Sequence, residues 1–169
     1  MVFSGCSRPN LKRKIKLNKI TPFLWFDSEA KEAMDLYVSI FKNSKVISAQ
    51  AMPDGNFISV EFELEGQRIM GLNAGPQYKF NEAVSFFVSC SDQDEVDYFW
   101  NALIADGGEE GRCGWLKDRF GLSWQIVPSA LGELLGNSDR EGANRAMQAM
   151  MKMNKIVVAD LQNAFDSYE

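Results

Sequence analysis

A strict alternation of apolar and polar side chains is the strongest pattern in the chain, and it covers residues 58–64 of the segment FISVEFEL. Alternation with a period of two predicts a half-buried strand. The flanking segments KVISAQA and QRIMGLN have the same character, and the turn signals Pro53-Asp54-Gly55-Asn56 and Glu65-Gly66 separate them. We therefore expect three consecutive strands between residues 45 and 73.

A helical pattern precedes these strands. Its apolar positions lie three or four residues apart and so share one helix face: Ala30, Ala33, Met34, Tyr37 and Phe41. Ser28 stands where a side chain caps a helix N-terminus. Residues 21–26 (TPFLWF) predict a strand before the helix. The first half of the chain thus reads β-α-β-β-β.

The second half repeats this order in a shorter form. Residues 83–90 (AVSFFVSC) predict a strand, and Asp92 and Glu95 have the spacing of a capping box. The apolar residues that follow stand at helical spacing: Val96, Phe99, Trp100, Leu103 and Ile104. Gly107-Gly108 marks the end of this helix. The segments CGWLK and LSWQIV predict two more strands, which gives β-α-β-β.

Beyond Pro128 the pattern is helical, in three segments. The last part of the chain is rich in methionine: Met147, Met150, Met151 and Met153. We interpret this group as the packing of an amphipathic helix on the core, in preference to an adaptable ligand or partner surface.

Composition indicates one globular domain. Of 169 residues, 46% are hydrophobic and 24% charged, and no apolar run reaches the ~18 residues that a membrane span needs. We expect a soluble chain with a flexible basic leader at residues 1–19 and a single domain at 20–169. The domain divides into module one (20–75), module two (82–128) and a helical tail (129–169).

The chain contains no histidine, which excludes Ser-His and Cys-His nucleophile pairs and every histidine-containing metal site. The three cysteines, Cys6, Cys90 and Cys113, lack CxxC spacing and are odd in number. We therefore expect free thiols in a reducing compartment, the cytoplasm, and no nucleophilic cysteine. The first ten residues lack the pattern of a signal peptide.

Charge is distributed unevenly along the chain. All six charged residues among positions 1–19 are basic, which leaves 12 basic and 23 acidic residues beyond them and a net charge of −11. An acidic surface repels phosphate backbones, so we expect neither a nucleic-acid nor a membrane partner for the folded part. The alternative to a flexible leader is a basic contact with nucleic acid or a membrane.

Four phrases spread over residues 20–166 resemble one protein family: FLWFDSEAKEAMDLYVSIF, GPQYKFNEAVSFFVSCSD, CGWLKDRFGLSWQIVP and AMMKMNKIVVADLQNAF. They are similar to the PhnB-like, demethylubiquinone methyltransferase-like branch of the glyoxalase/bleomycin-resistance/dioxygenase (vicinal oxygen chelate) superfamily. The resemblance implies an α+β fold in which two paired βαβββ-type modules form a curved, cup-like mixed sheet with a helical C-terminal tail. It also implies a homodimer and a small-molecule ligand in the cup.

In metal-dependent relatives, four side chains that line the cup bind a divalent ion. The resemblance places these positions at Thr21 or Pro22, at residues 71–73, at Ser85 and at Gln125. None of them is a histidine or a carboxylate, and neutral amides and hydroxyls supply no charge to offset dehydration of the ion. We expect no metal and no other cofactor.

Alternation along the strands adds aromatic side chains to the same faces. The expected ligand-binding residues are Thr21, Phe23, Trp25, Asn73, Ser85, Phe87 and Gln125. This lining favours a small hydrophobic or planar molecule, and the alternative is that the aromatic side chains simply close the core. Asp118-Arg119 is interpreted as an exposed turn pair.

Three functions are compatible with these patterns. The first is metal-independent binding of a small hydrophobic or aromatic molecule in the cup. The second is a metal-dependent lyase, isomerase or dioxygenase of the same superfamily, and the third is a structural or interaction dimer. Methyl transfer is disfavoured, because the strand-to-helix joints Asp27-Ser28 and Ser91-Asp92 lack the glycines that bring a backbone close to a nucleotide cofactor.

Overall fold

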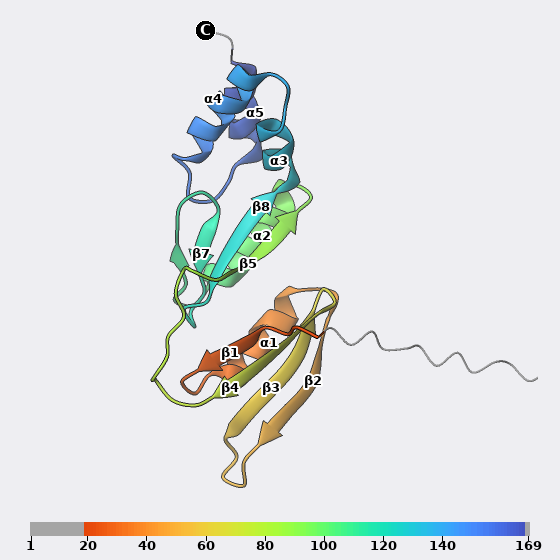
Figure 1. Cartoon of the computed structure of the whole chain (residues 1–169), viewed down its shortest axis with the longest axis vertical. Coiled ribbons are helices and arrows are strands. Elements are labelled where there is room, and N and C mark those ends of the chain that lie inside the picture. The colour runs from red at the N-terminus through yellow and green to blue at the C-terminus, as the bar shows by residue number, and fades with distance from the viewer. Residues whose placement is uncertain (1–18, 168–169) are drawn as a thin grey trace, which may run out of the picture.

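The computed structural model describes residues 19–167 as thirteen helices and strands. The basic leader and Cys6 lie outside these residues, so the expectations for them are not tested. None of the helices in the described part is long and apolar enough to cross a bilayer. Figure 1 shows two sheets, one from each half of the chain, followed by a group of short helices.

Module one has the predicted β-α-β-β-β order. Its elements are β1 (Phe23–Phe26), α1 (Ala30–Ile40), β2 (Ser44–Ala51), β3 (Phe57–Leu64) and β4 (Gln67–Asn73). The strand order in the sheet is β1-β4-β3-β2, with β1 parallel to β4 and the other pairs antiparallel. Glu65 and Gly66 have φ angles of 46° and 82°, which makes the predicted tight turn between β3 and β4.

Module two is a second copy of the same topology. Its elements are β5 (Ser85–Cys90), α2 (Gln93–Ile104), β6 (Glu109–Glu110), β7 (Trp115–Lys117) and β8 (Ser123–Pro128). The sheet order is β5-β8-β7-β6, with β5 parallel to β8. The strand β6 is not predicted by the sequence pattern, because its two glutamates carry no hydrophobic alternation and only pairing with β7 makes them a strand.

The predicted capping box of α2 is confirmed. The Asp92 carboxylate accepts a hydrogen bond from Glu95 N at 2.9 Å, and the Glu95 carboxylate accepts one from Ser91 N at 2.8 Å. Two backbone donors at the helix start are satisfied by these bonds, which is why α2 begins where the sequence places it.

Each sheet has one face covered by its helix and one face that its helix leaves uncovered, which we call the open face. The alternation predicted for β3 holds, because Val60, Phe62 and Leu64 are buried on the side of α1. The exposed fractions of Phe23 (56%) and Phe87 (58%) show that an aromatic side chain stands uncovered on each open face.

The two modules join through their helix-covered faces. Tyr37 and Phe41 of module one contact Trp124 of β8, with ring centroids 5.3 and 5.6 Å apart. Phe26 contacts Phe120 at 6.3 Å. These side chains belong to one hydrophobic core that spans both modules, so the open faces remain outside it.

Asp118 lies at the centre of this junction and not on the surface. Its exposed fraction is 3%, and its carboxylate accepts hydrogen bonds from Tyr37 Oη (2.7 Å), Trp124 Nε1 (2.9 Å) and the backbone N–H groups of Phe120 and Leu122. The interpretation of Asp118-Arg119 as an exposed turn pair was therefore wrong for Asp118. The four donors come from both modules, a circumstance that no local turn signal reveals.

The helical tail is built from α3 (Ser129–Leu135), α4 (Arg140–Met150) and α5 (Val158–Asp166). It has a small core of its own, formed by Leu131, Leu134, Ala146, Ile156 and Leu161. Two backbone bonds of 2.8 Å, from Cys113 N to Met153 O and from Gly114 N to Asn154 O, tie it to module two.

The methionines of the tail divide into two pairs. Met150 and Met153 pack against the tail core, as expected for core residues. Met147 and Met151 are 42% and 53% exposed, so the prediction of core packing was wrong for these two.

We predict that the Asp118 hydrogen bonds carry much of the stability of the module junction. Tyr37→Phe is expected to lower the free energy of unfolding by about 2 kcal/mol, because it removes one donor from a buried charged acceptor. Asp118→Ala should cost about 3–5 kcal/mol, because it leaves buried donors unpaired. Urea unfolding measures both values. Tyr78→Phe, at a tyrosine that is 59% exposed, is the matched control, and an equal loss in the control would contradict this account.

The pH dependence of stability should report on the same carboxylate. Burial raises the pKa of Asp118, even though the hydrogen bonds from Tyr37, Trp124 and the backbone act in the opposite direction. An acid with a raised pKa in the folded state binds its proton more tightly there than in the unfolded state. Its contribution to the free energy of unfolding is therefore present at low pH and is lost as pH rises through the folded-state pKa. The unfolding free energy of the wild type should therefore fall relative to that of Asp118→Asn as pH rises from about 4. A wild-type unfolding free energy that rises relative to that of Asp118→Asn over the same pH range would contradict the prediction.

Candidate functional site

The structure brings three of the predicted ligand-binding residues together on the open face of module two. Gln125 Nε2 donates a hydrogen bond of 2.8 Å to Ser85 Oγ, across the parallel pair β5 and β8. Phe87 stands opposite Gln125 in the register of the same pair. These side chains form a small polar group beside an exposed ring.

The predicted residues of module one lie on a different sheet. Trp25 Nε1 donates to Gly75 O at 2.8 Å, and its ring meets Tyr78 edge-on with centroids 5.0 Å apart. Phe23 precedes it on the same face of β1, and Thr21 is half-buried just before the strand. Their role in ligand binding stays a prediction.

The side-chain amide of Asn73 is hydrogen-bonded to backbone groups at the start of α1 and at the start of β3. Its Oδ1 accepts from Ala30 N at 2.8 Å, and its Nδ2 donates to Ser28 O at 2.8 Å and to Phe57 O at 3.0 Å. The prediction that Ser28 caps α1 was wrong, because the N-cap residue is Glu29, without a side-chain cap bond. Asn73, 43 residues further along the chain, supplies the acceptor instead.

The side chains at the positions where the resemblance places metal ligands do not fit a divalent ion. Ser85 and Gln125 are neutral and hydrogen-bonded to each other, and the side-chain amide of Asn73 is hydrogen-bonded to backbone groups. Nor does any cluster of three or more cysteine, aspartate or glutamate side chains within residues 19–167 have a metal-binding arrangement. Divalent ions require anionic oxygen, imidazole or thiolate ligands.

Cys90 is also unsuited to nucleophilic chemistry. It is 1% exposed, and burial, followed by the charges of Glu95 and Asp92, raises the pKa of its thiol to about 11. At neutral pH the thiolate, which is the reactive form, is therefore scarce.

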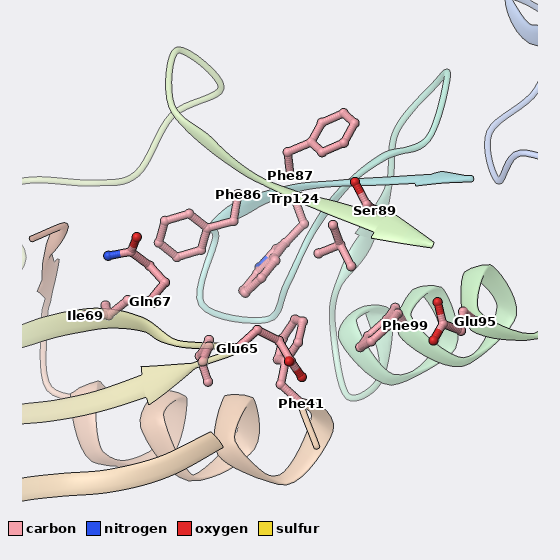
Figure 2. Close-up of a pocket in the computed structure, with 12 residues that line it drawn as sticks. Phe41, Glu65, Gln67, Ile69, Phe86, Phe87, Ser89, Glu95, Phe99 and Trp124 are labelled. Carbon is pink, nitrogen blue, oxygen red and sulfur yellow. The ribbon is translucent and has the colours of Figure 1, made fainter. Parts of the chain in front are cut away.

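A pocket of about 530 Å³ lies at the seam between the two modules, along the outer edge of β5 (Figure 2). Module one contributes the end of α1 and the hairpin between β3 and β4, and module two contributes β5, α2 and β8. The lining residues are Phe41, Leu64, Glu65, Gln67, Ile69, Phe86, Phe87, Val88, Ser89, Glu95, Phe99 and Trp124. Of the seven predicted site residues, Phe87 alone lines it.

The floor of this pocket is a group of packed aromatic rings. The Phe41 ring stacks on Phe99 (centroids 5.0 Å apart, 25° between planes) and on Trp124 (5.6 Å, 21°). Phe86 meets Trp124 edge-on at 5.2 Å. Because Phe41 and Trp124 are buried in the shared core, the floor is held rigidly by the same packing that joins the modules.

The rim of the pocket is polar. Glu65, Gln67, Ser89 and Glu95 are all exposed. One oxygen of Glu65 accepts from Asn43 N at 3.1 Å, and one oxygen of Glu95 accepts from Ser91 N at 2.8 Å. The two carboxylates are therefore oriented by the backbone, at the β3–β4 turn and at the first turn of α2.

Sequence reasoning missed this pocket. Phe41 and Phe99 were assigned to apolar helix faces, which is correct for most of their surface. The pocket exists because segments from positions 41, 64–69, 86–89, 95–99 and 124 converge. Spacing along one strand or one helix carries no signal of such a convergence.

Comparison with known proteins places the fold in a family. The model of the family described as 3-demethylubiquinone-9 3-methyltransferase matches residues 18–127, which end just before α3. No curated protein matches the chain.

One solved structure agrees with this match in sequence identity and coverage, and others are similar at lower identity. A PhnB protein from Bacillus cereus, described as a 3-demethylubiquinone-9 3-methyltransferase, is 31% identical, with a TM-score of 0.62 over 66% of this chain and 100% of its own. A Pseudomonas aeruginosa protein is 18% identical, with a TM-score of 0.53 over 66% and 98% of the two chains. A glyoxalase/bleomycin resistance protein from Albidiferax ferrireducens is 13% identical, with a TM-score of 0.44 over 62% and 92%.

Proposed function

The chain belongs to the PhnB-like, 3-demethylubiquinone-9 3-methyltransferase family. From this premise we propose that it binds a small hydrophobic or aromatic molecule without a metal. The proposed site is the pocket at the seam of the modules. The proposed site therefore lies at the edge of β5, next to the cup that the sequence predicts. Phe87 belongs to the predicted cup and also lines the pocket.

The aromatic pocket of about 530 Å³ is the observation that carries this proposal. Small-molecule sites are usually concave, largely apolar and about 300–1,000 Å³ in volume, with a few polar groups that orient the ligand. The floor of Phe41, Phe86, Phe99 and Trp124 and the polar rim have this character. A preformed, rigid floor favours affinity, because little conformational entropy is lost on binding.

Two other activities receive less support from the described residues. Metal-dependent chemistry needs a ligand set that Ser85, Gln125 and Asn73 do not supply. For methyl transfer, the joints between β1 and α1 and between β5 and α2 carry no glycine, whereas the common methyltransferases approach their cofactor through a glycine-rich turn. The family description therefore does not lead us to propose methyl transfer.

The cytoplasm remains the proposed location. Cys90 and Cys113 are free thiols in the structure, as expected for a reducing compartment.

Binding should depend on Phe87 and not on Phe23. The neutral fluorescent probe phenylnaphthylamine is expected to bind with saturable fluorescence enhancement, and Phe87→Ala should weaken its affinity about fivefold through lost apolar contact. Phe23→Ala is the matched control, because the two rings are similarly exposed (56% and 58%) and Phe23 does not line the pocket. A loss with Phe23→Ala alone would place the ligand on module one and overturn the proposed site.

We also propose that the chain forms a homodimer through the open face of module one. Phe23 on β1 is an exposed apolar side chain on a strand at the edge of its sheet, and such surfaces favour association. Sedimentation at micromolar concentration is expected to give a dimer, and Phe23→Glu should shift it toward the monomer. Met147→Glu, in the tail, should not, and a monomeric wild type would exclude the dimer.

A further inference from the structure

We propose that the ligand of the pocket at the module seam is an organic cation, an apolar or aromatic body that carries an ammonium group. This inference rests on the proposed function, because it names the chemical class of the molecule that the pocket binds. Three features support it: the aromatic floor, the two carboxylates of the rim and the acidic surface beside them.

The floor supplies the faces of aromatic rings. Phe86 and Phe99 are partly exposed, so their rings are within reach of a bound molecule, and Phe87 lines the pocket from the opposite face of β5. Ring faces are electron-rich and attract ammonium groups through cation–π interactions, which strengthen when the cation is partly desolvated. The same rings bury an apolar body.

The rim supplies uncompensated negative charge. Neither Glu65 nor Glu95 forms an ion pair with a lysine or arginine within residues 19–167. The structure gives each of them one hydrogen bond, from the backbone of Asn43 and of Ser91, to one carboxylate oxygen. The second oxygen of each carboxylate is therefore available to an ammonium donor, whose charge strengthens the hydrogen bond.

The surroundings extend this negative charge. An adjoining pocket shares Glu65, Glu95 and Phe99 with the first. It adds Asp92 and Asp94, with Lys42 as the single cation. Four carboxylates against one lysine produce a negative local field, and a cleft with apolar walls concentrates such a field on an approaching cation. An anionic ligand of the same size would be repelled.

The test compares three probes that have the same apolar body: phenylbutylamine, phenylbutanol and phenylbutyrate. Calorimetric titration of the full chain should give the order of affinity amine, alcohol, acid. Glu65→Gln and Glu95→Gln each remove one charge but keep the acceptor for the backbone N–H. Each variant should weaken the amine about fivefold and leave the alcohol unchanged, since a partly exposed ion pair contributes modestly.

Glu133→Gln is the matched control, because it removes the same charge from an exposed position on α3 that does not line the pocket. It should change the affinity of none of the probes. Added salt should reduce the advantage of the amine over the alcohol.

The outcomes separate this inference from the function on which it rests. Equal binding of amine and alcohol, with both sensitive to Phe87→Ala, would overturn the cation preference and leave the hydrophobic pocket in place. Binding of the amine that is insensitive to Phe87→Ala and equally weakened by Glu133→Gln would show general attraction to an acidic protein, and would overturn both proposals. If none of the three probes binds at millimolar concentration, both proposals are also overturned.

Discussion

The carboxylate of Asp118 is the interaction on which the arrangement of the molecule depends. It is a buried charge, and a buried charge is tolerated only where enough donors replace water. Here the four donors come from α1 of one module and from β8 and its preceding loop in the other. The bonds therefore form together only when the two modules meet in one orientation.

This orientation decides which surfaces remain for binding. The helix-covered faces of both modules are used in the shared core, where Phe26, Tyr37 and Phe41 meet Phe120 and Trp124. The open faces stay outside it, and a pocket remains at the seam where β5 passes the β3–β4 turn. The ring of Trp124 belongs to the hydrogen-bonded junction, the core and the pocket floor at once. The binding site that we propose is thus a direct product of the packing that holds the modules together.

The chemistry of the family positions agrees with a binding role. Where the resemblance places the ligands of metal-dependent relatives, this chain has Ser85 and Gln125, bonded to each other, and Asn73, which completes the start of α1. The carboxylates of the proposed site lie instead at the rim of the seam, on Glu65 and Glu95. The family match ends at residue 127, and the tail that follows packs on the far end of module two through Cys113 and Gly114.

The sequence by itself determined the family resemblance and every element except β6. Period-two alternation located β3, helical spacing located α1 and α2, and the Asp92–Glu95 spacing located the start of α2, because each of these signals depends on neighbours within a few residues. Only the tertiary structure decided the roles of Asn73, Asp118 and the pocket residues. Asn73 caps a helix 43 positions earlier in the chain, and Asp118 binds Tyr37 at a separation of 81 positions. Hydrogen bonds and cavities of this kind are made by contacts between distant segments, and local periodicity contains no information about such contacts.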